Sequence, residues 1–274
     1  MKRGGKTLKQ RRTTLLITAL ILLLSACQET QENQQTDHST DENTNNKNTE
    51  ENNTEEEDDD PWVLEEEQFN EIETVEGIET IQNPDNDQVL VNHDYAFPEG
   101  YEPDDLVVPD VLFSFDEDVE KRYLREPAAD ALEDLFDAAA DDGHDLFAVS
   151  GFRSYERQDA VFADAAEETS EEEASETVAN PGNSEHQTGL AMDISSESND
   201  FELNTSFAET EEGEWVAEHA HEHGFIIRYP EDGEEITEIS YEPWHLRYVG
   251  EEAAEVIYDH DITLEEFFDH AGKI

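Results

Sequence analysis

The pattern of apolar and polar positions changes near residue 82. Beyond it, apolar side chains recur every three or four residues, the spacing of a helix that buries one face. This spacing predicts helices over 127–142, 155–168, 214–223, 251–259 and 264–270. Pro127 suits the first turn of a helix, while Gly143 and Gly224 are typical residues at which a helix ends.

Short apolar runs between these segments predict strands. The expected strands are 89–92, 146–149, 190–194, 225–229, 236–240 and 244–249. The turn residues Glu231, Asp232 and Gly233 separate two of them, so we expect 225–229 and 236–240 to form a β-hairpin. Helices mixed with hairpin strands predict an α+β domain, in which helices flank an antiparallel sheet.

The beginning of the chain resembles an export signal. Residues 1–26 combine six basic residues with the apolar run 15–24, which is short for a membrane span. The sequence from Leu24 to Cys27 resembles the lipobox of bacterial lipoproteins, which implies that Cys27 is lipid-modified and becomes the new N-terminus. Ordinary cleavage and an uncleaved anchor are the alternatives. Cys27 is the only cysteine, so the chain forms no internal disulfide.

The next segments differ in how much apolar surface they can bury. Residues 27–60 are rich in Gln, Asn, Thr, Glu and Asp, and we expect a disordered acidic tether. Residues 61–81 regain apolar side chains and form an extension that is either a short helix or a strand packed on the domain. Residues 82–274 are then the folded domain, which we expect to be the catalytic one.

The chain is strongly acidic. It has 15 Lys and Arg against 74 Asp and Glu, a formal net charge of −59. Without the six basic residues of the leader the net charge becomes −65. Such a charge repels nucleic acid, so we expect no nucleic-acid partner. It suits strong salt, where screening is short-ranged, and indicates a halophilic or alkaliphilic source; a merely acidic tail is the alternative.

Two segments carry the residues of a catalytic zinc site. Ser184–Asp193 contains a histidine and an aspartate, and Glu242–His245 contains a glutamate and a histidine. Two imidazoles and one carboxylate suit Zn²⁺, and three protein ligands leave one position open. We therefore expect one zinc ion per chain, with His186, Asp193 and His245 as its ligands.

The geometry of the backbone sets conditions on this site. Alternation along the predicted strand places Asp193 on the face opposite the apolar core face. His186 lies an odd number of residues earlier, so it must sit in the preceding loop, where Gly189 allows the chain to bend. A bend must also bring Glu242 and His245 toward one point.

Two further residues have candidate catalytic roles. A carboxylate beside a catalytic zinc is the usual general base, which makes Glu242 the candidate. Arg153 follows a predicted strand and could bind an oxyanion or a carboxylate through its planar guanidinium. Taken singly, Asp193 could cap a turn, Glu242 could be a surface acid and Arg153 could form a salt bridge. Their combination and spacing favour the catalytic interpretation.

A second histidine cluster lies in the predicted helix 214–223. His219 and His223 share a helix face, which permits metal binding. The same segment, which also contains His221, lacks the acidic motif found in helical zinc sites. We therefore expect these histidines to lie on a solvated helix surface.

Three segments, in this order, resemble the VanY-type D-alanyl-D-alanine carboxypeptidases: Ser150–Tyr155, Ser184–Asp193 and Glu242–Gly250. The resemblance covers about residues 82–268 and implies a zinc peptidase of bacterial cell-wall metabolism, in the fold group of lysostaphin-type endopeptidases and the hedgehog signalling domain. The acidic insert 167–176 departs from the family pattern.

The resemblance implies a role for each matching residue. These are His186, Asp193 and His245 as zinc ligands, Glu242 as catalytic base, Arg153 at the developing oxyanion, and Ser184 and Gln158 as substrate contacts. The implied reaction is removal of the terminal D-alanine from peptidoglycan stem peptides by a D,D-carboxypeptidase. An L,D-carboxypeptidase, a peptidoglycan endopeptidase and a non-catalytic wall-binding module remain alternatives. We expect a monomer outside the cytoplasm, held at the outer face of the membrane by its lipid.

Overall fold

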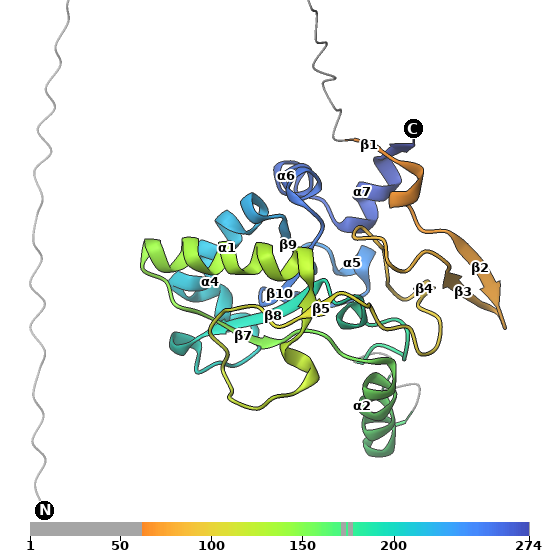
Figure 1. Ribbon diagram of the computed structural model, residues 1–274, viewed down its shortest axis with the longest axis horizontal. Helices are drawn as coiled ribbons and strands as arrows, with labels where there is room; N and C mark the ends of the chain where they lie inside the picture. The colour runs from red at the N-terminus through yellow and green to blue at the C-terminus, as the bar shows by residue number, and fades with distance from the viewer. Residues whose placement is uncertain (1–61, 171–173, 175–177, 274) are drawn as a thin grey trace, which may run out of the picture. The chain divides into compact units, whose positions relative to one another are not determined.

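The computed structural model describes residues 62–170, 174 and 178–273, shown in colour in Figure 1. At the centre lies a four-stranded sheet with the order β7-β8-β10-β9, in which each neighbouring pair is antiparallel. Its strands are β7 (Leu146–Ser150), β8 (Ala191–Ser196), β9 (Phe225–Ile227) and β10 (His245–Tyr248). Helices flank this sheet, so the predicted α+β class is confirmed.

The central strands β8 and β10 bring distant parts of the sequence together. All six residues of β8 are buried, as expected for a strand covered on both faces. Their pairing places His245 opposite Asp193. On the other edge of β8, a bulge between Ala148 and Ser150 shifts the register and places Ser150 beside Asp193 as well. The three sequence motifs therefore meet at one point of the sheet.

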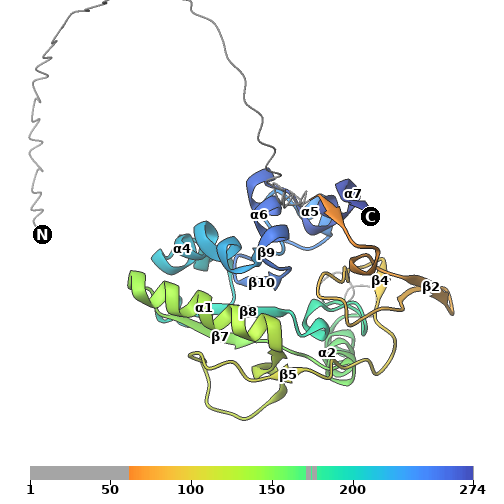
Figure 2. The same cartoon turned by 45° about the horizontal axis from the view of Figure 1, so that its top comes forward.

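Two helices cover this sheet, as Figures 1 and 2 show from two directions. Helix α1 (Glu126–Asp142) buries an apolar stripe made of Ala128, Ala129, Leu132, Leu135, Phe136 and Ala139. It ends at Gly143, whose φ of 95° is the left-handed conformation that glycine adopts readily. Helix α4 (Glu211–His219) lies beside α1 and contributes Trp215 and Val216 to the same core.

The remaining helices lie around this centre. Helix α2 (Tyr155–Glu168) follows β7, and helix α5 (Glu234–Thr237) is a single turn. Helices α6 (Glu251–His260) and α7 (Leu264–His270) enclose a second apolar cluster. Its members include Leu90, Ile226, Ile257 and Phe267.

Short strands pair outside the main sheet. They are β1 (Val63–Leu64), β2 (Ile72–Val75), β3 (Ile78–Ile81), β4 (Tyr95–Ala96), β5 (Leu106–Val107), β6 (Leu124–Arg125) and β11 (Gly272–Lys273). β2 and β3 form a hairpin, β4 joins β3 in parallel, and β5 pairs with β6. β1 lies parallel to β11, so the beginning and the end of the described chain share one small sheet.

The predicted helices are confirmed. α2 and α7 have the expected bounds, and α1 and α6 differ by one residue at one end. The segment 214–223 is divided, because α4 ends at His219 and a 3₁₀ helix continues over Ala220–His223 to Gly224.

Two predicted strands are wrong, and with them the hairpin. Residues 234–237 form helix α5, and β9 pairs with β10 instead. Ile236 is 44% exposed, so the apolar residues that suggested a strand do not share a buried face. Residues 89–92 form no strand either: Val89, Leu90 and Val91 are all buried, without the alternation of a sheet face. The Val89 carbonyl accepts a hydrogen bond from the Arg247 side chain.

The extension 61–81 folds as strands. Its residues from 62 onward form β1, β2, β3 and a 3₁₀ turn, and Leu64 and Ile81 enter the two apolar clusters. The leader 1–26, the tether 27–60 with Cys27, and part of the acidic insert lie outside the described residues. No helix among residues 62–273, where described, is both long and apolar enough to traverse a lipid bilayer.

Candidate active site

His186 is positioned by a short, buried 3₁₀ helix. The helix spans Glu185–Thr188 and ends at Gly189, where φ is 67°. A side chain at Gly189 would meet the Arg125 Cγ atom at 2.9 Å, so both conformation and space favour glycine. The Nδ1 atom of His186 lies 2.8 Å from the Gly151 carbonyl oxygen. A carbonyl can only accept, so Nδ1 carries the proton and Nε2 keeps its lone pair for the site.

The three predicted metal ligands lie together. Ligand atoms of His186, Asp193 and His245 are all within 4.8 Å of one another. The Asp193 carboxylate is 3.3 Å from His186 Nε2 and 2.8 Å from His245 Nδ1. The three residues are only 7%, 5% and 3% exposed, and the two rings cross at 83°. A buried carboxylate between two crossed imidazoles is a donor set that fits Zn²⁺.

The electrostatics of this set favour an ionised aspartate. Burial opposes ionisation, but the two histidines hold the pKa of Asp193 well below its usual range. No other cluster of this kind occurs in the part of the chain that the structure describes, the histidine-rich segment 219–223 included. There the His219 ring lies against Trp215 at a tilt of 31° and pairs with Glu222, and His221 stacks on Tyr258.

Glu242 faces the predicted metal ligands from the turn before β10. The His245 amide donates to the Glu242 carbonyl at 3.2 Å, and this is the bend that the sequence required. The Glu242 carboxylate lies 3.9 Å from His245 Nδ1 and its side chain is 30% exposed. Burial raises the pKa of Glu242, with His245 opposing, and a base is most effective when its pKa approaches the working pH.

Arg153 approaches the site from the junction of β7 and α2. Its backbone amide donates to the His186 carbonyl at 3.1 Å, and its guanidinium Nη1 donates to the Gln158 side chain at 3.0 Å. Ser154 caps the following helix by accepting from the Arg157 amide. This cap and the contact with Gln158 fix the direction of the guanidinium.

The predicted residues line one cavity of about 250 Å³. All seven take part: Arg153, Gln158, Ser184, His186, Asp193, Glu242 and His245. Gln158 is 1% exposed, and its Nε2 donates to the Ala179 carbonyl at 2.6 Å. Both ends of its amide are therefore held by the chain itself, and Gln158 holds Arg153 in place. Ser184 is 5% exposed and begins the 3₁₀ helix that carries His186.

The sequence patterns did not reveal the buried polar residues behind the predicted ligands. Glu185 is buried beside His186. Arg247 lies in β10 and Arg228 directly follows β9, and both arginines are less than 2% exposed. In a chain with 15 basic residues, two arginines inside apolar strand segments were a usable signal, since a buried arginine needs a carboxylate partner.

Fold and ligand set together define a class, the zinc metallopeptidases of the hedgehog-like group. Within it, the chain belongs to the VanY family, whose sequence model, described as D-alanyl-D-alanine carboxypeptidase, matches residues 121–251. The chain is thus a zinc metallocarboxypeptidase of the D-alanyl-D-alanine type, and the resemblance carried by the three motifs is confirmed.

Similar proteins support this placement. The chain is 58% identical over 211 residues to YodJ of Bacillus subtilis, described as a carboxypeptidase, covering 77% of each chain. The solved structure of the LD-carboxypeptidase LdcB is 58% identical, with a TM-score of 0.77, over 78% of this chain and 100% of that one. The vancomycin resistance D,D-pentapeptidase VanY, solved with Zn(II), is 34% identical, with a TM-score of 0.53, over 66% of this chain and 97% of that one.

Proposed function

We propose that the protein removes the terminal D-alanine from peptidoglycan stem peptides, and that the seven cavity residues perform this reaction. The observation that carries the proposal is the convergence of the His, Asp and His set with Glu242 and Arg153 in one cavity. When bound, zinc supplies Lewis-acid chemistry: it polarises a peptide carbonyl and makes water more acidic.

The chain's own residues handle protons and charge. Glu242 takes the proton from the attacking water and returns it to the leaving amine of D-alanine, so one carboxyl serves as base and then as acid. Arg153 stays cationic and faces the tetrahedral oxyanion, where a fixed donor stabilises the charge that develops. Gln158 keeps Arg153 in that direction. Ser184 contacts the substrate from the cavity wall.

The bond that is cleaved distinguishes two candidates. Family membership favours a D,D-carboxypeptidase acting on pentapeptide stems. An L,D-carboxypeptidase acting on tetrapeptide stems is favoured by the 58% identity to LdcB over its whole solved chain. Mass spectrometry of defined tetra- and pentapeptide stems, after incubation with the zinc-loaded protein, separates them. Loss of one alanine from only one stem identifies the specificity.

Other products would point elsewhere. Cleavage within a cross-bridge would indicate an endopeptidase. Binding of stem peptides without any cleavage would contradict the catalytic proposal and leave a wall-binding module.

We further propose that the protein works outside the cytoplasm as a lipid-anchored monomer in a salty environment. The support is in the sequence: a basic and apolar leader, Cys27 as its only cysteine, and a net charge of −59. A substrate in the cell wall agrees with this location.

A further inference from the structure

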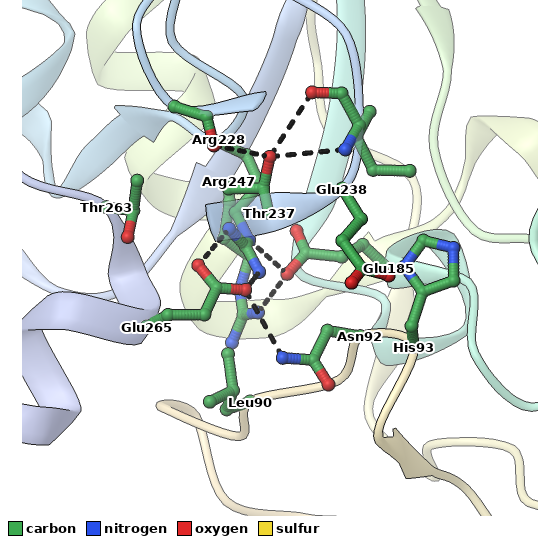
Figure 3. A network of polar contacts seen from close by, with 12 residues as sticks. Leu90, Asn92, His93, Glu185, Arg228, Thr237, Glu238, Arg247, Thr263 and Glu265 are labelled. Atoms are coloured by element: carbon green, nitrogen blue, oxygen red, sulfur yellow. Dashed lines mark hydrogen bonds and ion pairs between the residues drawn. The ribbon is translucent and has the colours of Figure 1, made fainter. Parts of the chain in front are cut away.

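Glu185 is a carboxylate enclosed by two arginines. It is 2% exposed, and its Oε1 atom accepts from Arg228 Nε at 2.8 Å and from Arg247 Nη1 at 2.9 Å. Arg228 is itself shared with Glu265, whose two oxygens lie 2.6 and 2.9 Å from the guanidinium (Figure 3). Despite its burial, Glu185 keeps a pKa below the usual range because Arg228 and Arg247 stabilise its charge.

The second oxygen of this carboxylate faces a metal ligand. Glu185 Oε2 lies 3.5 Å from His245 Nε2, and neither atom has another hydrogen-bond partner among the described residues. The other nitrogen of the same ring, Nδ1, faces Asp193 in the metal site. Buried polar atoms are nearly always paired, so the two facing atoms are natural partners.

We propose that Glu185 is a positioning residue for zinc: it accepts the Nε2 proton of His245 and so keeps the Nδ1 lone pair directed at the metal. A neutral imidazole has one protonated nitrogen and one lone pair, and the partner of the first decides the position of the second. Outer carboxylates commonly orient metal-bound histidines in this way. The proposal rests on His245 being a zinc ligand.

Residue 185 must accept hydrogen bonds on both sides, from the two arginines and from His245, and only a carboxylate offers two acceptor oxygens. Arginine only donates hydrogen bonds, so Arg228 and Arg247 both require an oxygen in front of them. In Glu185→Gln the amide oxygen would take that place, and the amide NH₂ would face His245 Nε2. The ring would then have to accept there and carry its proton on Nδ1, the tautomer that cannot bind zinc.

The test compares two variants with the same loss of charge. Glu265→Gln removes a carboxylate from the same arginine without touching His245, so it is the matched control. Zinc dissociation constants are measured by competition with a chelator at one pH. We expect zinc binding to weaken about 10- to 100-fold in Glu185→Gln and to change little in Glu265→Gln.

A second measurement does not depend on any variant. Nitrogen NMR of the zinc-loaded wild type reports which ring nitrogen of His245 carries the proton, and we expect Nε2. Equal zinc affinity in the two variants, or a proton on Nδ1, would overturn the proposal. If His245→Ala also keeps its zinc, the ligand set itself is wrong, and this result is distinct from failure of the positioning role.

A separate observation concerns the distribution of positive charge. Eight basic residues lie in the described part of the chain, and three of them, Arg125, Arg228 and Arg247, are buried against carboxylates. Of the other five, Lys121, Arg153 and Arg157 line one groove of about 610 Å³. For a chain with 74 acidic residues, this is a marked local concentration of positive charge.

The groove adjoins the catalytic cavity. Arg153 and Val161 line both hollows. Glu120 is the acidic residue in the groove wall, and its carboxylate accepts a hydrogen bond from Ser154. Arg157 has no carboxylate partner within ion-pair distance in the described structure, so its guanidinium is available to a ligand.

We infer that this groove binds a carboxylate of the substrate that lies away from the cleaved bond. A chain of this charge repels anionic peptides, and a cationic wall beside the cavity offsets that repulsion where the substrate must lie. The inference deepens the proposed function, since it assigns a carboxylate-bearing peptide to the same site.

The test uses two peptides that differ only at one interior side chain, a carboxylate in one and its carboxamide in the other. Arg157→Gln should raise KM for the carboxylate peptide about three- to tenfold, leave kcat unchanged, and leave both constants for the carboxamide unchanged. Lys273→Gln removes a charge that lies over the Phe69 ring and does not line this groove, so it is the control. Equal KM changes for the two peptides would overturn the inference, while cleavage of both by the wild type would leave the proposed function intact.

Discussion

Replacing Glu242 by glutamine removes the proposed base and preserves the shape of the side chain. General-base catalysis contributes about 10²- to 10⁴-fold, or about 2.7 to 5.4 kcal/mol of the barrier. The structure favours the upper half of this range. Of the three carboxylates that line the cavity, Asp193 belongs to the proposed metal set and Glu185 is held by two arginines, so we expect neither to replace Glu242.

The assay is steady-state hydrolysis of the stem peptide that the wild type cleaves, together with zinc content. We expect Glu242→Gln to lower kcat by about 10³-fold or more, with one zinc per chain and an unchanged substrate affinity, because the lost interaction belongs to the transition state. Glu235→Gln is the matched control, since Glu235 is an exposed acid in the nearby helix α5. A loss of less than about tenfold in Glu242→Gln would mean that the base lies elsewhere.

Three further predictions concern metal, anchor and salt. His186→Ala and His245→Ala should each abolish stoichiometric zinc binding, as measured by metal analysis after dialysis; full occupancy in both would refute the ligand assignment. The wild-type protein should partition with membranes, and Cys27→Ser should release it or leave it unprocessed; a soluble wild type that begins at another residue would contradict the lipoprotein prediction. The melting temperature should rise with NaCl, because salt screens the repulsion among 74 acidic residues. A flat or falling curve would show that the charge does not destabilise the fold.

Sequence patterns located the proposed ligands because each motif carries its functional residues within a short segment. Two histidines and an aspartate in the two motifs, with Gly189 to bend the chain, were enough to predict the site, and the structure brings these three residues together. The longer helices α1, α2, α4, α6 and α7 were likewise predictable, since their apolar residues recur at helical spacing and several have a clear end, such as Gly143 at the end of α1. The single turn of α5 was not predicted.

What escaped prediction depends on long-range pairing. Strand β10 lies between β8 and β9, so β9 pairs with β10 and not with the segment around Ile236. The local sequence of that segment does not reveal this pairing. The buried segment at Val89 reads as a strand because its side chains are apolar, yet its carbonyl pairs with Arg247 from far along the chain. The role proposed for Glu185 depends on the same kind of contact, two arginines that only the folded chain brings near it.

The short parallel pair of β1 and β11 has a consequence for the order of folding. Val63 pairs with Gly272 and Leu64 with Lys273. The two strands of this pair therefore come from the beginning and the end of the described chain, and β1 can pair only when β11 is available. Contacts of such sequence separation form late, since the intervening chain must first be closed into a loop. Strands β8 and β10, which carry the site, can therefore pair before β1 pairs with β11. In a refolding experiment followed by hydrogen exchange, we expect the backbone amides of β1 to become protected later than those of β8.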